Sequence, residues 1–304
     1  MISCSHIKDI MGKPKGCTDL TKSQRNTFKK LKELEELADS QKETLAVLQA
    51  KIDRYNDPEL SAAGKKYLLS RYSWEKYNRG TLPSEQKSSY LIKGNELEGD
   101  AIDFISKRDN TDYQRQEEFT NNGFIYGKAD VLRPDGNLVI DVKVSWSIHS
   151  FLPHNINKLN EKYWWQMQGY MDIYDVNVGQ VRYILLNTPP TLVERERIKY
   201  TEKYMLGEID SEAYEEAMER LDLCYDYSKI PEKRRIITFE ISREKEIADF
   251  IYKKVNRCRI WLHEYDIIHT KNEKVLISSK DYAIFSKENN TESDTGEPHS
   301  GDQE

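Results

Sequence analysis

The sequence has few cysteines and no long apolar run. Its four cysteines are scattered and no Cys-x-x-Cys pair occurs, so neither a zinc knuckle nor a disulfide framework is predicted. No stretch of about 18 apolar residues could form a membrane-spanning helix. The first residues lack the basic and apolar segments of a secretory signal. We therefore expect reduced, buried thiols in a cytoplasmic protein with no membrane partner.

An excess of positive charge is also lacking, because the formal net charge is −6. Six acidic residues and one lysine lie in 286–304, so −5 of this charge belongs to that segment and −1 to the rest of the chain. The segment is rich in Ser, Thr, Asn and Gly, which predicts a disordered acidic tail over 286–304. A nearly neutral body can still contain a basic groove, so the charge neither supports nor excludes a DNA partner.

Between residues 28 and 55 a heptad-like apolar stripe predicts helix. Its members recur at steps of three and four: Leu31, Leu34, Ala38, Gln41, Leu45, Leu48, Ile52 and Tyr55. Ser40-x-x-Glu43 matches a capping box, which would divide the stretch into a helical hairpin. One long helix and two shorter helices both remain open. We interpret 28–57 as a coiled-coil-like insertion that serves in packing or oligomerisation.

The middle of the chain changes its hydrophobic period from that of helices to that of strands. Strands are predicted over 115–120, 123–132 and 137–144, with Pro134-Asp135-Gly136 as the last turn. Helices are predicted over 62–77, 95–107, 161–174 and 244–263, further strands over 180–186 and 235–241, and a charged helix or helix pair over 191–222. This order favours a single α/β domain over 1–285. Its core would be a helix, a three-stranded antiparallel sheet, a helix and a further strand, with C-terminal helices added.

Four ionisable residues stand out in this core: Glu98 on a predicted helix, Asp130 on one hairpin strand, and Asp141 and Lys143 on the next. Side chains alternate along a strand, so Asp141 and Lys143 share a face and Val142 points the other way. Charged residues in an apolar strand are costly without partners; a buried ion pair or a solvated face would be the ordinary explanation. As a set, the three acids and the lysine predict a hard-oxygen site for Mg²⁺, with Mn²⁺ as a substitute.

The segment 163–170 reads Tyr-Trp-Trp-Gln-Met-Gln-Gly-Tyr and is predicted to be helical. Tyr163, Gln166 and Tyr170 fall in one row, and Gln168 lies to one side. An adjacent apolar row of Trp164, Met167 and Met171 is expected to pack on the sheet. The polar row either binds phosphate near the metal site or forms an ordinary helix surface.

The order Gly-x-x-x-Glu, Gly-x-x-Asp, Asp-x-Lys and Gln-x-x-x-Tyr resembles the signature of PD-(D/E)XK nucleases of the RecB-like branch. The finer resemblance is to lambda-exonuclease or YqaJ-like viral recombinases. Three segments carry it: Gly94-Asn-Glu-Leu-Glu-Gly-Asp-Ala101, Tyr163-Trp-Trp-Gln-Met-Gln168, and Ile2-Ser-Cys-Ser-His6 followed by Met11-Gly-Lys-Pro-Lys15. The resemblance covers about 2–20 and 65–265 and implies a restriction-endonuclease-like core.

The resemblance also implies roles for individual residues. Asp130, Asp141 and the Val142 carbonyl would hold Mg²⁺, Glu98 would serve a second metal or its water, and Lys143 would act on the attacking water. Further substrate contacts are implied for Ser5 (5′-phosphate), Lys128, Gln166, Gln168 and Tyr170. A helix N-cap is the alternative for Ser5.

The chain departs from the family pattern in three places. Ala129 replaces a proline that is no ligand, and Asp141 replaces the commoner glutamate, whose longer arm would place the metal differently. A basic residue that the family places upstream of Ser5 has no counterpart, which puts the grip on the DNA end in doubt.

The function implied is a Mg²⁺-dependent 5′→3′ exonuclease acting on double-stranded DNA ends. It would leave single strands for a recombinase or an annealing protein, and by analogy the chain would form a ring-shaped homo-oligomer. One alternative is an endonuclease or CRISPR-adaptation nuclease on the same core; the iron–sulfur cluster usual in the latter is disfavoured because Cys224 and Cys258 lie far apart. A non-catalytic DNA-binding relative is the other, and the intact acids and lysine argue against it. His149 and His154 are predicted to have surface or hydrogen-bonding roles.

Overall fold

The computed structural model describes residues 1–80, 88–156, 158–205, 209 and 211–271. By their internal contacts the residues divide into two compact units, Met1–Arg259 and Ile260–Glu304. The fold and the site described below belong to the first unit. The predicted acidic tail over 286–304 lies outside the described residues. Within the described residues, no helix combines the length and apolarity needed to cross a membrane.

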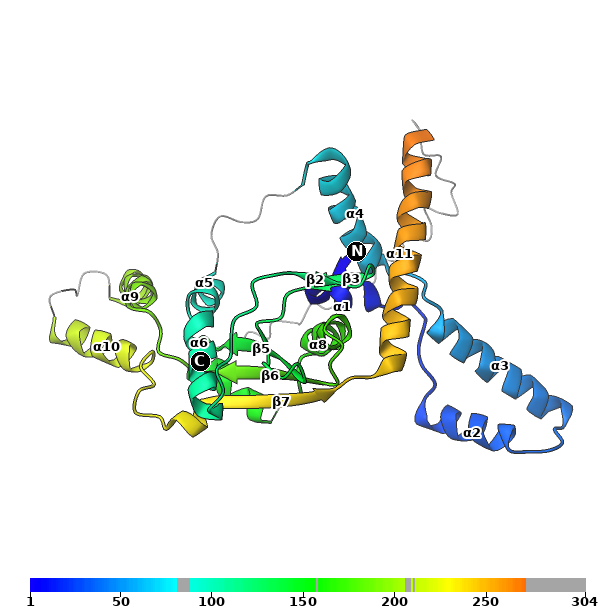
Figure 1. Cartoon of the computed structure of the whole chain (residues 1–304), viewed down its shortest axis with the longest axis horizontal. Coiled ribbons are helices and arrows are strands. Elements are labelled where there is room, and N and C mark those ends of the chain that lie inside the picture. The colour runs from blue at the N-terminus through cyan, green and yellow to red at the C-terminus, as the bar shows by residue number, and fades with distance from the viewer. Residues whose placement is uncertain (81–87, 157, 206–208, 210, 272–304) are drawn as a thin grey trace, which may run out of the picture. The chain divides into compact units, whose positions relative to one another are not determined.

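A four-stranded mixed sheet forms the centre of the first unit (Figure 1). Its strands, in spatial order, are β4 (Val131–Leu132), β5 (Leu138–Val144), β6 (Val178–Ile184) and β7 (Ile236–Ser242). The turn before β5 contains Gly136 at φ 70°, a conformation that glycine adopts without strain. β5 runs parallel to β6, while β4 and β7 are antiparallel to their neighbours. A parallel pair needs a crossover connection, and helix α8 (Glu161–Ile173) lies in it.

Helix α6 (Glu98–Asp109) covers one face of this sheet (Figure 1). The buried core there includes Ala101, Ile102, Ile105, Ile140 and Val142. Because side chains alternate along β5, Asp141 and Lys143 project from the opposite face. The predicted separation of Val142 from its two neighbours is therefore confirmed.

Helix α8 lies on that opposite face. Of the predicted apolar row, Met167 and Met171 are fully buried and Trp164 is half-buried. The two methionines approach the sheet closely at Gly179 in β6, where an added Cβ would lie 2.7 Å from the Met167 Cε. A larger residue at position 179 would therefore force the end of the Met167 side chain to move.

A second, small sheet has the order β1-β3-β2 and contains β1 (Ile2–Ser3), β3 (Ile125–Gly127) and β2 (Thr120–Asn121). The predicted strand 123–132 is therefore wrong in its continuity, because β3 and β4 belong to different sheets. The close approach of Gly127 to Tyr170 on α8 accompanies this break. The predicted strand 115–120 is reduced to one isolated bridge between Arg115 and Val131, ahead of β2.

Other helices follow the predictions with shifted ends. The predicted helix 95–107 is two helices, α5 (Ser89–Glu96) and α6, and Leu97 between them has φ −100° and ψ 9°. The region 191–222 is a helix pair, α9 (Pro190–Tyr204) and α10 (Glu212–Leu223). The remaining helices are η1 (Cys4–His6), α1 (Ile7–Met11), α4 (Ala62–Tyr77), α7 (Ile148–Phe151), η2 (Leu152–Asn155), η3 (Glu232–Arg234) and α11 (Lys245–Lys271).

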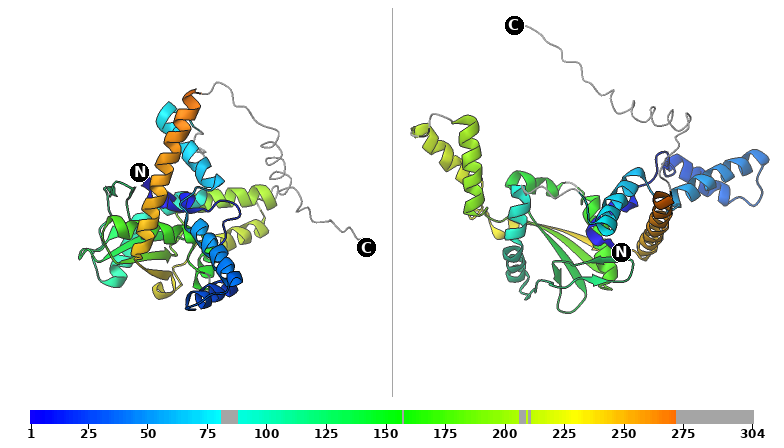
Figure 2. Two further views of the ribbon diagram at one scale, coloured as in Figure 1. Left: turned by 90° about the vertical axis from the view of Figure 1, so that its right-hand side faces the viewer. Right: turned by 90° about the horizontal axis from the view of Figure 1, so that it is seen from above.

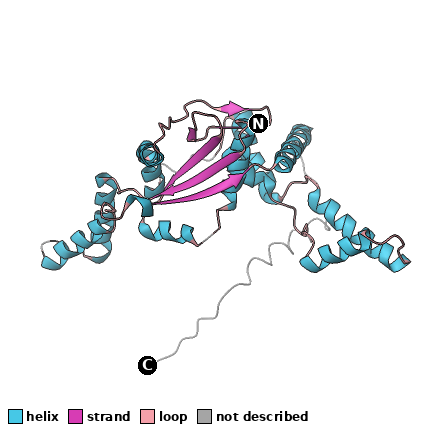
Figure 3. Ribbon diagram, turned by 60° about the horizontal axis from the view of Figure 1, so that its bottom comes forward, coloured by secondary structure: helices cyan, strands magenta, loops and turns pink. Residues whose placement is uncertain are grey.

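The heptad-like stretch forms two helices, α2 (Lys22–Lys32) and α3 (Asp39–Asn56), which pack on each other. We call residues 13–57 the helical arm; Figures 2 and 3 show that this pair extends away from the central sheet. The predicted capping box at Ser40 is wrong, since α3 begins at Asp39 and the Ala38 amide donates to Gln41 Oε1 at 2.9 Å. Leu31 and Leu48 of the stripe are buried, whereas Leu34 lies exposed in the connecting turn.

All four cysteines are free thiols. Cys4 and Cys258 are buried, and Cys17 is half-buried. Cys224 is exposed just after α10, so the prediction of burial is wrong for that residue.

Candidate active site

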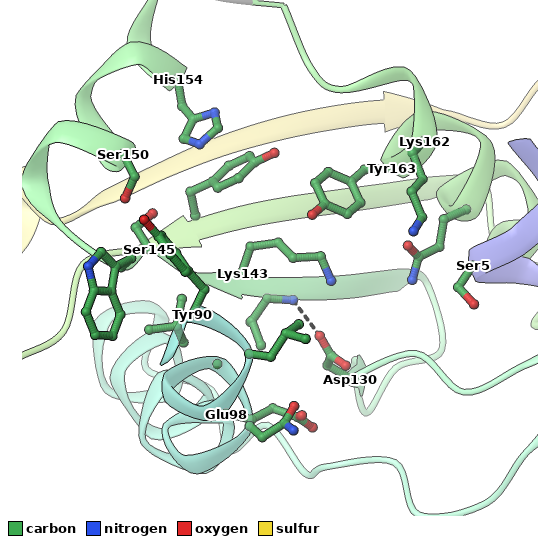
Figure 4. A pocket seen from close by; sticks show the side chains of 18 residues that line it. Ser5, Tyr90, Glu98, Asp130, Lys143, Ser145, Ser150, His154, Lys162 and Tyr163 are labelled. Carbon is green, nitrogen blue, oxygen red and sulfur yellow. Dashed lines mark hydrogen bonds between the residues drawn. The ribbon is translucent and has the colours of Figure 1, made fainter. Parts of the chain in front are cut away.

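A cavity of about 500 Å³ opens beside the end of β5. Six residues singled out from the sequence line it: Ser5, Glu98, Asp130, Val142, Lys143 and Gln166. Figure 4 shows Lys143 in the middle of the cavity, with Ser5 and Lys162 toward one end and Ser145, Ser150 and His154 toward the other. The cavity is therefore a trough with charged groups at its centre.

The half-buried Lys143 forms an ion pair with Asp141, with 2.5 Å between Asp141 Oδ2 and Lys143 Nζ. Only 2% of the Asp141 side chain is exposed. Its Oδ1 accepts a hydrogen bond from Gln166 Nε2 at 3.2 Å, but Oδ2 has no hydrogen-bond partner of regular geometry. Burial acts to lower the pKa of Lys143, yet the Asp141 and Asp130 carboxylates outweigh it and raise that pKa. The Lys143 ammonium therefore neutralises the Asp141 carboxylate in this structure.

Asp130 lies between β3 and β4, on the turn that separates the two sheets. Its Oδ2 accepts a hydrogen bond from the Val142 amide at 2.7 Å, which joins it to β5. Burial and the neighbouring Asp141 carboxylate raise the pKa of Asp130 to about 7, although Lys143 opposes this. The Asp130 carboxyl group, whose charged form the Asp141 carboxylate disfavours, is thus held beside β5.

Glu98 begins α6 and reaches the same cavity from its other side. Its carboxylate is paired with Arg115, with 2.9 Å between Glu98 Oε1 and Arg115 Nη2. Among the described residues, no group of three or more His, Cys, Asp or Glu is placed to hold a metal ion. Glu98 is therefore a neighbour of the two aspartates and does not form a three-acid cluster with them. The sequence reading did not single out Arg115.

The donor set at Asp130 and Asp141 fits a small divalent cation. Asp141 Oδ2 is a buried carboxylate oxygen without a regular hydrogen bond, and Asp130 has a raised pKa in the same place. Mg²⁺ takes one or two carboxylates and completes its shell with water and substrate oxygens. Asp130 lines the open trough and matches that requirement, whereas Asp141 does not line it and pairs its Oδ2 with the Lys143 ammonium.

The polar residues of α8 are divided between two tasks. Gln166 Nε2 donates to Asp141 and, at 2.9 Å, to the Tyr170 hydroxyl, so Tyr170 supports the glutamine. Gln168 instead donates to the Ser242 carbonyl at 2.9 Å and accepts from the Glu244 amide at 3.0 Å. Within the described part of the chain, Gln168 links α8 to the end of β7 and does not line the trough.

Ser5 and Lys128 are the two implied phosphate contacts. Ser5 lines one end of the trough, and its Oγ lies 3.0 Å from Ser3 Oγ. It does not cap η1 or α1, whose N-cap residues are Ser3 and His6. Lys128 follows β3, is half-buried, and makes no ion pair with any described residue. It does not contribute to the lining of the trough.

Several lining residues were not singled out as site residues from the sequence. Lys162 precedes the motif segment of α8 and lines the trough. The Tyr163 ring also lines it, with its centroid 5.1 Å from Lys143 Nζ. His154 stacks on Tyr183 with 3.6 Å between ring centroids, so it has a packing role inside the trough. At the same end lie Tyr90 and Trp146, with 5.1 Å between their ring centroids. The position of Lys162 beside the glutamine motif could have identified it as a site residue from the sequence. No local sequence pattern indicated the aromatic contacts.

Lys93 on α5 is a buried cation behind the trough wall, with 0% of the residue exposed. Its Nζ donates to the Trp146 carbonyl and to Thr188 Oγ1, both at 2.9 Å. These bonds join α5 to the segments that follow β5 and β6. No carboxylate of the described chain contacts it, and burial lowers the pKa of Lys93 to about 7.

This burial predicts a specific dependence of stability on pH. The ordinary pKa of a lysine, 10.5, lies above the folded value of about 7, so the unfolded chain binds more protons between these values. Stability should therefore rise with pH in that window, by about 1 kcal/mol per pH unit from this group. We expect the unfolding free energy of the wild type minus that of Lys93→Met to rise by this amount between about pH 8 and 9. Urea unfolding at each pH measures it, and parallel curves for the two proteins would contradict the assignment.

Comparisons with known proteins bear on the fold. No protein-family model matches the chain, and no curated protein matches it. Among solved structures, a phage related exonuclease from Haemophilus somnus 129PT is similar at 23% identity and a TM-score of 0.58, over 87% of this chain and 94% of that one. An alkaline exonuclease from Laribacter hongkongensis gives 13% identity and a TM-score of 0.47 over 71% and 87% of the two chains. The predicted restriction-endonuclease-like α/β fold is thus confirmed: this chain has the fold of the phage-related exonuclease.

Proposed function

We propose that this protein is a metal-dependent deoxyribonuclease that degrades duplex DNA from its ends in the 5′→3′ direction. The observation that carries the proposal is that Asp130 and Lys143 line one open trough, while Asp141, which is buried and does not itself line it, is ion-paired with Lys143 through Oδ2. The fold shared with a phage-related exonuclease supports the same activity. Mg²⁺ is the proposed cofactor, and Mn²⁺ its substitute.

Asp130, Asp141 and the Val142 carbonyl would hold the cation. When bound, Mg²⁺ supplies a Lewis acid beside the scissile phosphate and an acidified water. Lys143 places a positive charge in the middle of the trough, where negative charge develops on the phosphate oxygens during attack. Gln166 holds the Asp141 carboxylate in place through Oδ1, and Oδ2 is paired with the Lys143 ammonium. The chain thus preorganises charge around one phosphodiester.

The ends of the trough suit different parts of a DNA strand. Ser5 offers a hydroxyl and Lys162 an ammonium at one end, a combination that fits a terminal phosphate. Glu98 faces the cavity from α6, and its proposed role is to hold a water of a second cation. Lys128 is a proposed contact to a phosphate farther along the strand. A homo-oligomer and an annealing protein or recombinase that takes the single-stranded product are proposed partners.

Linear duplexes labelled at one end or the other test the proposal directly. With Mg²⁺ we expect the 5′-end label to be released first, faster from 5′-phosphorylated ends, and covalently closed circles to stay intact. EDTA should stop release. If the 3′-end label leaves first, the polarity is wrong. Equal DNA loss with Mg²⁺ and with EDTA, or no loss in either, would remove the enzyme assignment.

A further inference from the structure

Helix α2 on the helical arm has an unusually one-sided charge. It contains five cations and no acidic residue: Lys22, Arg25, Lys29, Lys30 and Lys32. All five are exposed. Four of them follow one another at steps of three, four and three, which places them in a single row along the helix. We call Lys22, Arg25, Lys29 and Lys32 the cationic row.

The cationic row is largely without anionic partners. In the part of the chain that the structure describes, Arg25 pairs with Asp19, and Lys32 lies 5.0 Å from the Phe28 ring centroid. Lys22 and Lys29 make no ion pair there. Like charges a turn apart on a helix destabilise it slightly. The row therefore lowers the stability of α2 in the isolated chain.

The row matches the charge spacing of a nucleic-acid backbone. Ten residue steps of about 1.5 Å give a row of roughly 15 Å. A strand of duplex DNA carries a negative charge about every 3.4 Å along the helix axis. Four cations could therefore lie opposite about four phosphates of one strand, which is a close match in charge density.

Other partners fit this face poorly. The apolar side of α2, with Phe28 and the buried Leu31, packs on α3 and is not free to enter a lipid surface. The exposed residues of α2 are all polar or charged. Lysine is depleted in the cores of protein–protein interfaces, which need apolar or aromatic anchors. A polyanion is the partner whose chemistry the row suits.

The arm is also anchored at its base. Lys254 on α11 is fully buried, and its Nζ donates to the Gly12 carbonyl at 3.3 Å and to the Glu59 carbonyl at 2.6 Å. These carbonyls belong to the chain just before and just after the arm. Lys13 Nζ donates a further hydrogen bond to the Tyr55 carbonyl, which joins the first and last segments of the arm at its base. A fixed base lets the arm hold a bound duplex in a defined direction.

We propose that the cationic row binds the phosphate backbone of duplex DNA without reading its bases. The arm would hold the part of the duplex that has not yet reached the trough. The choice of duplex DNA as the polyanion rests on the proposed function, whereas the charge argument does not.

The test measures binding in EDTA, where no metal-dependent cleavage can occur. A variant with Lys22→Gln, Lys29→Gln and Lys32→Gln is compared with a control that carries Lys229→Gln, Lys233→Gln and Lys245→Gln, which loses the same charge at other exposed positions. The affinity for a labelled duplex of about 30 base pairs is followed by anisotropy from about 50 to 200 mM salt. Each phosphate contact contributes about −0.9 to the slope of log affinity against log salt.

We expect the row variant to have a slope shallower by about 2.7 than the wild type, so that the wild type loses roughly 40-fold more affinity over this range. The control should keep the wild-type slope. Lys22→Arg, Lys29→Arg and Lys32→Arg together should also keep it, because arginine retains the charge. Equal slopes for the row variant and the control would overturn the proposal.

Two further outcomes separate this inference from its rivals. If the row variant binds DNA like the wild type but changes its sedimentation, the row contacts a second copy of the chain and the proposal is overturned. If the wild type cuts no DNA yet the slopes differ as expected, the row binds DNA and it is the nuclease assignment that fails. We expect circular dichroism spectra of all variants to match that of the wild type, because the substituted residues are exposed.

Discussion

Lys143→Ala is expected to lower DNA cleavage on the order of 10²- to 10³-fold while duplex binding stays close to that of the wild type. Lys143 Nζ lies in the middle of the trough, 2.5 Å from Asp141 Oδ2, where charge develops on the phosphate. Removing it takes away stabilisation that matters most in the transition state, so the rate falls more than the affinity. Single-turnover digestion with Mg²⁺ and anisotropy in EDTA measure the two quantities separately.

The same substitution leaves Asp141 buried without its cation, and breaking a buried pair on one side costs about 3–5 kcal/mol. A lower unfolding free energy in metal-free buffer is therefore expected, and Mg²⁺ should restore part of it by binding the freed carboxylate. Lys143→Arg is the matched control, since it keeps the charge and should retain more stability than Lys143→Ala. Wild-type turnover by Lys143→Ala would refute the role assigned to this residue.

Asp141→Asn should weaken the binding of Mg²⁺ and Mn²⁺ by at least about 10²-fold and reduce cleavage to a similar extent. The amide has no negative charge, and its oxygen or nitrogen would replace the Oδ2 atom that has no regular hydrogen bond. Titration calorimetry with Mn²⁺ reads the affinity independently of activity.

Glu240→Gln is the matched acid-to-amide control for this experiment. Glu240 lies on the edge strand β7, accepts a hydrogen bond from Gln180, and does not line the trough among the described residues. Both its Mn²⁺ affinity and its cleavage should equal those of the wild type. An Asp141→Asn protein that binds Mn²⁺ as tightly as the control would show that Asp141 is no ligand.

The local pattern of the chain was sufficient for much of the core. Period-two alternation predicted that Asp141 and Lys143 share one face of β5 while Val142 faces the other, and the burial of Val142 against α6 agrees. Steps of three and four predicted the buried row of α8, including Met167 and Met171. These features depend on residues a few positions apart, whose side-chain directions follow from backbone geometry.

The local sequence pattern could not predict that residues 123–132 are divided between two sheets. β3 pairs in parallel with β1 at the start of the chain, and β4 pairs with β5. An apolar run gives no information about which distant segment will supply its hydrogen bonds. The placement of Asp130 in the break, with its carboxylate on the Val142 amide, is a consequence of that long-range choice.

Charged groups whose partners lie far away in the chain show the same limit. Lys93 and Lys254 are buried because carbonyls from distant segments accept their hydrogen bonds. Arg115, which no local motif pointed to, pairs with Glu98 at the cavity that Asp130 also lines. A sequence names the residues that can carry charge in a core. The packing of distant segments, which only the folded chain brings together, decides which charged residues meet and which are paired with an opposite charge.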